Sequence, residues 1–201
     1  SKFAALTLIL GSFAVWSPLT GQAPPSERRV VDRAERLLHG GQAAEARTVL
    51  TEYLSRAPAS MSALSLLSEL MLKLDEQLGF LEFAESAVAA ASEDPAIREL
   101  WVKALLGAGF RDSARAVAKR WIMQSPDEAK ARIVRTEVEL VEGDTANAIR
   151  FLQEGGRRTD EVVMRLAELL LAMGRSNELV IAWSELLGFD PPLVEVVVEG
   201  L

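Results

Sequence analysis

Apolar positions along the chain follow a long period. Leucines recur at intervals of 34, 34, 34 and 31 residues, at Leu38, Leu72, Leu106, Leu140 and Leu171. Three residues after these leucines come, in order, Gly41, Asp75, Gly109, Gly143 and Gly174. A period in the low thirties without a strand pattern predicts stacked helical hairpins, with the turn of each hairpin at the glycine column.

Two further columns keep this register and carry mostly small residues. Five residues after the turn stand Ala46, Phe80, Ala114, Ala148 and Leu179. Seven residues before the turn stand Ala34, Ser68, Val102, Thr136 and Ala167. Small side chains are expected where two helices cross at close range, so these columns predict the contact within each hairpin. Phe80 and Leu179 are oversized for this position.

The pattern predicts five helix pairs and a further segment from Pro191. The expected helices span 27–39 and 42–57, 60–74 and 77–92, 95–108 and 111–124, 127–142 and 144–154, and 159–173 and 175–188. Gly155 and Gly156 lie where the second helix of the fourth pair would still run. Because glycines end helices in a left-handed conformation, we expect that helix to lose its last turn.

Three stretches resemble the second half of a tetratricopeptide repeat: Gly41–Ala46 with Leu50, Tyr53 and Pro58, residues 109–126, and residues 143–152. The resemblance covers about residues 26–192 and implies an all-α fold, a right-handed superhelical array of about five hairpins. Another helical-hairpin repeat is the alternative. The bulky aromatic residue that the family favours early in its first helix is replaced by Val30, Leu64, Arg98, Arg132 and Val163.

An uncharged run over residues 3–19 precedes the repeats. As a helix it would span roughly 25 Å, the short end of what crosses a bilayer core. Its apolar members are Phe3, Leu6, Leu8, Ile9, Leu10, Phe13, Val15, Trp16 and Leu19. We expect a retained transmembrane anchor. A signal peptide over residues 1–23, ending at the small residues of 21–23, and a buried cap on the first repeat are the alternatives.

The chain is therefore divided into a hydrophobic membrane anchor (1–22), a Pro-rich linker (23–26) and a repeat domain (27–201). A basic start, an apolar run and a small-residue exit favour an extracytoplasmic, periplasmic repeat domain. The arginines at 28, 29, 33 and 36 favour the opposite orientation, since positive charge near a span tends to stay inside. We expect the extracytoplasmic face.

Composition argues against most chemistry. The net charge of -7 and the isoelectric point near 4.9 oppose nucleic-acid binding, which needs a basic surface. The chain has no cysteine and a single histidine, His39, so thiolate sites and histidine pairs are excluded. Gly107 to Gly109 lack the Lys-Ser or Lys-Thr of a phosphate-binding loop. We expect no catalytic residue, no cofactor and no metal site, and hence not an enzyme.

The resemblance to tetratricopeptide repeats implies a binding groove on the first helices, lined by the ninth and twelfth positions of each repeat. The ninth positions are Glu35, Glu69, Lys103, Glu137 and Glu168, and the twelfth are the five periodic leucines. A ladder of apolar side chains flanked by mostly acidic ones suits a basic amphipathic helix or an extended basic segment. Alternatively, the leucines only pack neighbouring helices and the glutamates only keep the face soluble.

These observations predict a non-catalytic scaffold or accessory subunit that docks on or assembles a membrane protein complex. Its partners would be other protein subunits, in a respiratory, photosynthetic or secretion complex that the sequence does not distinguish, together with the lipid bilayer. The alternative is a soluble extracytoplasmic adaptor that binds a basic peptide, with residues 1–23 as its signal peptide.

Overall fold

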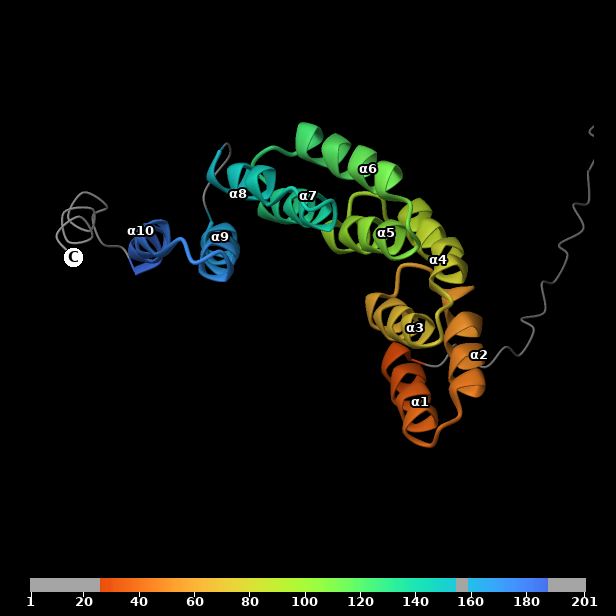
Figure 1. Ribbon diagram of the computed structural model, residues 1–201. Coiled ribbons are helices and arrows are strands. Elements are labelled where there is room, and N and C mark those ends of the chain that lie inside the picture. The colour runs from red at the N-terminus through yellow and green to blue at the C-terminus, as the bar shows by residue number, and fades with distance from the viewer. Residues whose placement is uncertain (1–25, 155–158, 188–201) are drawn as a thin grey trace, which may run out of the picture.

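The computed structural model describes residues 26–154 and 159–187. Every regular element in those ranges is an α-helix, and ten helices form five consecutive hairpins (Figure 1). Their bounds are α1 Glu27–His39, α2 Ala43–Leu54, α3 Met61–Lys73, α4 Gln77–Ala90, α5 Pro95–Gly107, α6 Arg111–Gln124, α7 Ala129–Val141, α8 Thr145–Gln153, α9 Asp160–Ala172 and α10 Ser176–Leu187. The predicted all-α helical-repeat fold is confirmed.

The hairpins form an extended row and not a closed bundle. Each first helix contacts the first helix of the next hairpin, from α1 to α3 and onward to α9, and each second helix contacts the first helix that follows it. Figure 1 shows the row curving from α1 and α2 at one end to α9 and α10 at the other. Contacts between neighbours alone are the arrangement of a solenoid, which leaves long continuous faces exposed.

The turn column adopts the left-handed backbone conformation at all five positions. The φ angles are 75° at Gly41, 60° at Asp75, 84° at Gly109, 82° at Gly143 and 68° at Gly174. In the first hairpin the Gly41 amide donates to the Leu38 carbonyl at 3.0 Å and the Gln42 amide donates to the Leu37 carbonyl at 2.8 Å. The same two hydrogen bonds close the other four turns. These two hydrogen bonds satisfy carbonyls that the end of a helix leaves unpaired. They require a residue in the left-handed conformation, which explains why glycine recurs at the turns.

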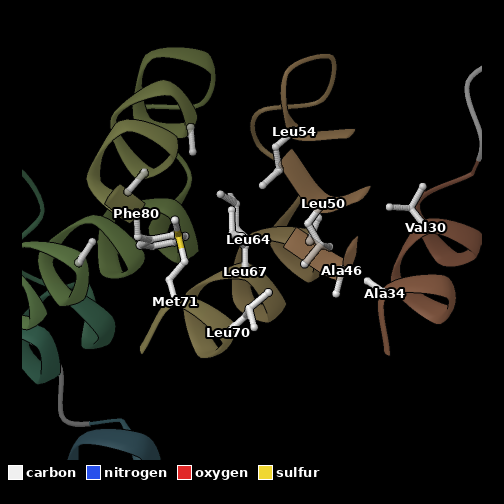
Figure 2. Packing of buried hydrophobic residues seen from close by; sticks show 14 of the residues in the cluster. Val30, Ala34, Ala46, Leu50, Leu54, Leu64, Leu67, Leu70, Met71 and Phe80 are labelled. Atoms are coloured by element: carbon white, nitrogen blue, oxygen red, sulfur yellow. The ribbon is translucent and has the colours of Figure 1, made fainter. Parts of the chain in front are cut away.

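Most positions of the small-residue columns lie in the core, as their register predicts, whereas Ser68 and Leu179 are half-buried. Ala46, Ala114 and Ala148 are fully buried, and so is Ala34 in the first helix. The oversized Phe80 is also buried, and Figure 2 shows it beside Met71 in the first of three hydrophobic clusters. Close approach of the two helices at the alanines sets the geometry of each hairpin.

In the fourth repeat, Arg132 stands at the position where the tetratricopeptide pattern has an aromatic residue, and it has a different structural role there. The side chain is 1% exposed, and its Nη2 donates to the backbone carbonyls of Phe151 at 3.2 Å, Leu152 at 2.9 Å and Glu154 at 3.2 Å. These carbonyls belong to the end of α8, which has nine residues where the other second helices have 12 to 14. The predicted shortening of this helix is confirmed, and a buried arginine caps its end.

Three predictions fall outside the described residues: the membrane segment 3–19, residues 155–158 and the segment from Pro191. Within ranges 26–154 and 159–187, no helix is both long and apolar enough to cross a bilayer.

The substitution Ala114→Leu tests the hairpin contact. Ala114 has no exposed surface, so the larger side chain overpacks α5 against α6 and costs roughly 1 to 3 kcal/mol of unfolding free energy. Ala116→Leu on the same helix is the matched control, because Ala116 is exposed. Urea titration followed by circular dichroism gives both values. Equal stability of the two variants would contradict the register.

Candidate partner-binding groove

The predicted groove positions lie on the five first helices, but their exposure differs along the array. Glu35, Glu69, Lys103 and Glu168 are exposed, whereas Glu137 is half-buried. Among the leucines, Leu72 and Leu171 are each 61% exposed. Leu38, Leu106 and Leu140 are half-buried, and the first two pack against the hydrophobic clusters. The leucine column therefore packs against hydrophobic clusters at Leu38 and Leu106 and presents apolar surface at Leu72 and Leu171.

A hollow of about 490 Å³ lies between α1 and α3. It is lined by Glu35, Leu38, His39, Ala43, Leu66, Glu69, Leu70, Lys73 and Leu74. The structure thus brings together three of the predicted groove residues, Glu35, Leu38 and Glu69. Neither Glu35 nor Glu69 forms an ion pair with any described residue. The hollow therefore combines an apolar lining with two carboxylates that form no ion pair, and it also holds the cation Lys73.

His39 has a structural contact in this region. Its Nδ1 donates to the backbone carbonyl of Glu35 at 2.8 Å, one turn earlier in α1. The carbonyls at a helix C-terminus are the expected partners of such a side chain. In the described ranges no group of three or more histidine, aspartate or glutamate side chains is placed to hold a metal ion.

The centre of the groove is neutralised by its own ion pairs. Glu99 of α5 accepts from Lys103 at 2.6 Å and from Lys130 of α7 at 2.7 Å. Lys103 Nζ also lies 3.9 Å from the Glu137 carboxylate, so a chain of four charges joins α5 to α7. Among the predicted positions, Lys103 and Glu137 are therefore paired with each other. Sequence reasoning missed Glu99 and Lys130, because only the stacking of two hairpins brings them together.

The pKa values of this cluster follow from burial and pairing. Burial raises the pKa of Glu99, but the hydrogen bonds and charges of Lys103 and Lys130 outweigh it and hold the pKa below its ordinary value of 4.5. The hydrogen bond from Glu99 raises the pKa of Lys130 above its ordinary value, against an opposing effect of burial. Both shifts favour the charged forms and hence the contact between α5 and α7.

Glu168 at the far end is also paired, with Arg165 at 2.8 Å on the same helix. Of the four predicted groove glutamates, Glu137 and Glu168 thus have cationic partners and Glu35 and Glu69 have none in the part of the chain that the structure describes. The unneutralised acidic surface lies on the first two hairpins. The sequence shows Arg165 three residues before Glu168, but it gives no sign of the pairing between α5 and α7.

The stacked hairpins and their left-handed turns define an all-α helical-repeat fold. The chain is similar in structure to the tetratricopeptide-repeat protein TTC0263 of Thermus thermophilus, with 24% sequence identity, a TM-score of 0.52, and coverage of 87% of this chain and 96% of that chain. It is also similar to a tetratricopeptide repeat protein from Parabacteroides merdae, with 14% identity, a TM-score of 0.54, and coverage of 85% and 68%. No protein-family model and no curated protein matches the sequence. These likenesses show the fold.

Replacing Glu99 tests the central ion cluster. Because the pKa of Glu99 is lowered by folding, the pairing stabilises the protein above the ordinary value of 4.5 and is lost as the pH falls through the lower folded-state pKa. Glu99→Gln should cost up to about 1 kcal/mol near neutral pH, the range for partly exposed pairs, and should reduce the acid sensitivity of the melting temperature.

Glu85→Gln is the matched control, since Glu85 is exposed on α4 and has no ion pair within the described ranges. Thermal melts at neutral and acidic pH measure both variants. An acid dependence of Glu99→Gln identical to that of the wild type would contradict the assignment.

Proposed function

We propose that this protein is a non-catalytic scaffold that binds a basic segment of a partner protein along its first two hairpins. The hollow between α1 and α3 carries this proposal, because its two unneutralised carboxylates, Glu35 and Glu69, flank apolar surface. Contact of the partner with the apolar surface of the hollow supplies binding free energy, and the two carboxylates favour a partner segment of positive charge.

Part of the apolar lining of the hollow is accessible to a partner. Leu74 lines the hollow and is 42% exposed. An amphipathic helix with leucines on one side and lysines or arginines on its flanks matches this combination of surface types. Lys73 is the one cationic residue among the described residues that line the hollow. Because it repels positive charge, it favours a partner whose basic residues lie toward Glu35 and Glu69.

The membrane setting of this function rests on residues 3–19. We propose that this uncharged run anchors the chain in the bilayer, with the repeat domain on the extracytoplasmic face, so that the partner is a subunit of a membrane protein complex. If the run is instead a signal peptide, the same groove would act in a soluble adaptor. Membrane retention of the mature chain separates the two proposals.

Charge reversal in the hollow tests the groove. The probe is a synthetic amphipathic helical peptide of leucine and lysine, titrated into the full chain in mild detergent and followed by fluorescence anisotropy. Reversing both Glu35 and Glu69 to lysine should weaken binding at least about tenfold, since two attractive charge contacts become repulsive. Wild-type binding should also weaken with added salt, because exposed charges are screened over about 8 Å at physiological ionic strength.

Two controls locate the effect. Glu85→Lys on α4 changes the net charge by as much as Glu69→Lys alone and should leave peptide affinity unchanged. Glu137→Lys should have a smaller effect than Glu69→Lys, because Glu137 already faces Lys103. Losses of equal size from Glu69→Lys and Glu85→Lys would count against this groove.

Washing of native membranes with alkaline carbonate tests the anchor. Seventeen consecutive uncharged residues bury enough apolar area, at roughly 25 cal/mol per Å², to outlast the removal of peripheral proteins. The full chain should stay in the pellet, and a variant lacking residues 3–19 should be released. Release of the full chain would favour the soluble adaptor.

A further inference from the structure

The first hairpin carries a cluster of arginines on the side that faces away from the second hairpin, although the protein as a whole is acidic. A hollow of about 180 Å³ between α1 and α2 is lined by Arg29, Val30, Arg33, Val49, Glu52, Tyr53 and Arg56. Arg29, Arg33 and Arg56 are exposed, and none of them forms an ion pair with a described residue. These three residues are called the arginine patch below. Glu52 is the one acidic residue in the lining.

Helical geometry places the arginine patch on the outer end of the row. Arg29 and Leu38 are nine residues apart, or about two and a half helical turns, so they lie on opposite sides of α1. Leu38 faces the hollow shared with α3, and Arg29 therefore points away from the second hairpin. On α2, Arg47 pairs with Glu76 of the second hairpin at 2.5 Å, whereas Glu52 and Tyr53 lie in the outer hollow.

The position of the arginine patch in the chain indicates its partner. Arg29 comes ten residues after Leu19, the last residue of the proposed bilayer segment, so only a short linker separates the two in the sequence. Arg36 continues the same face of α1 one turn beyond Arg33, and it too has no ion pair within the described ranges. Guanidinium groups bind phosphate with paired hydrogen bonds. Tyr53 in the same hollow adds an aromatic ring, a side chain that is common at membrane interfaces.

We propose that the arginine patch docks on anionic phospholipid headgroups and thereby seats the first hairpin against the membrane surface. Charge complementarity carries this assignment, since a chain of net charge -7 keeps three arginines without ion pairs together on the first hairpin, which follows the apolar run in the sequence. Docking there directs the row of hairpins, and the acidic hollow between α1 and α3, away from the bilayer. The contact does not depend on the groove having a basic partner.

Vesicle flotation of the full chain tests the patch. The two vesicle types are phosphatidylcholine alone and phosphatidylcholine mixed with phosphatidylglycerol, and the measured quantity is the ratio of the two partition coefficients. The apolar run contributes to both partition coefficients and cancels in the ratio. Each arginine at an anionic surface strengthens binding about fivefold, so the wild-type ratio should be at least about tenfold after the opposing effect of Glu52.

Three variants make the result specific. Arg29→Gln, Arg33→Gln and Arg56→Gln together should bring the ratio close to one, and the corresponding three lysine substitutions should keep most of it. Arg111→Gln, Lys119→Gln and Arg120→Gln on α6 remove the same charge from exposed positions elsewhere and should leave the ratio unchanged. Circular dichroism confirms that each variant is folded.

Several outcomes would overturn the proposal. A wild-type ratio near one would leave an acidic protein segment as the occupant of the patch. Equal losses from the α6 control would show a response to net charge alone. Displacement from anionic vesicles by millimolar inorganic phosphate, at constant ionic strength, would indicate a free phosphate ligand.

Discussion

The array depends on one backbone constraint, a residue in the left-handed conformation at the turn of every hairpin. At Gly41, Gly109, Gly143 and Gly174 this conformation is open to glycine without strain, and at Asp75 the chain adopts it with a short polar side chain. The two amide hydrogen bonds that follow close each first helix and reverse the chain. The same register brings the small residues of the columns into the crossing between helices, so turn and core are set together.

Local signals made the fold predictable from sequence. The glycine period places the turns, and buried alanines such as Ala114 and Ala148 lie where the register puts them. The role of Arg132, which stands where the tetratricopeptide pattern has an aromatic residue, could not be predicted. Its burial is explained by its hydrogen bonds to the carbonyls at the end of α8, which only the structure shows. An arginine in that column carries no sign, in the sequence alone, of which carbonyls it reaches.

The candidate groove was less predictable, because its charge depends on contacts between hairpins. The sequence presents Glu35, Glu69 and Glu137 as equivalent positions of successive repeats. Stacking makes them different: Glu137 faces Lys103 across α5 and α7, while Glu35 and Glu69 have no ion pair with a described residue. Two surfaces of opposite charge result on the first two hairpins, the acidic hollow toward α3 and the arginine patch on the outer end. These two surfaces are the basis of our proposals that one face binds a protein partner and the other docks on a membrane.

Site-specific photo-crosslinking tests this account most directly. A photoreactive amino acid replaces Leu72, which is 61% exposed on α3 one turn after Glu69, or Met123, which is 73% exposed on α6, in the full chain in its native membranes. The account predicts that position 72 crosslinks to a protein through a peptide of net positive charge, that Glu69→Lys suppresses this product, and that position 123 does not form it. The same product from both positions, or an acidic peptide at position 72, would contradict it.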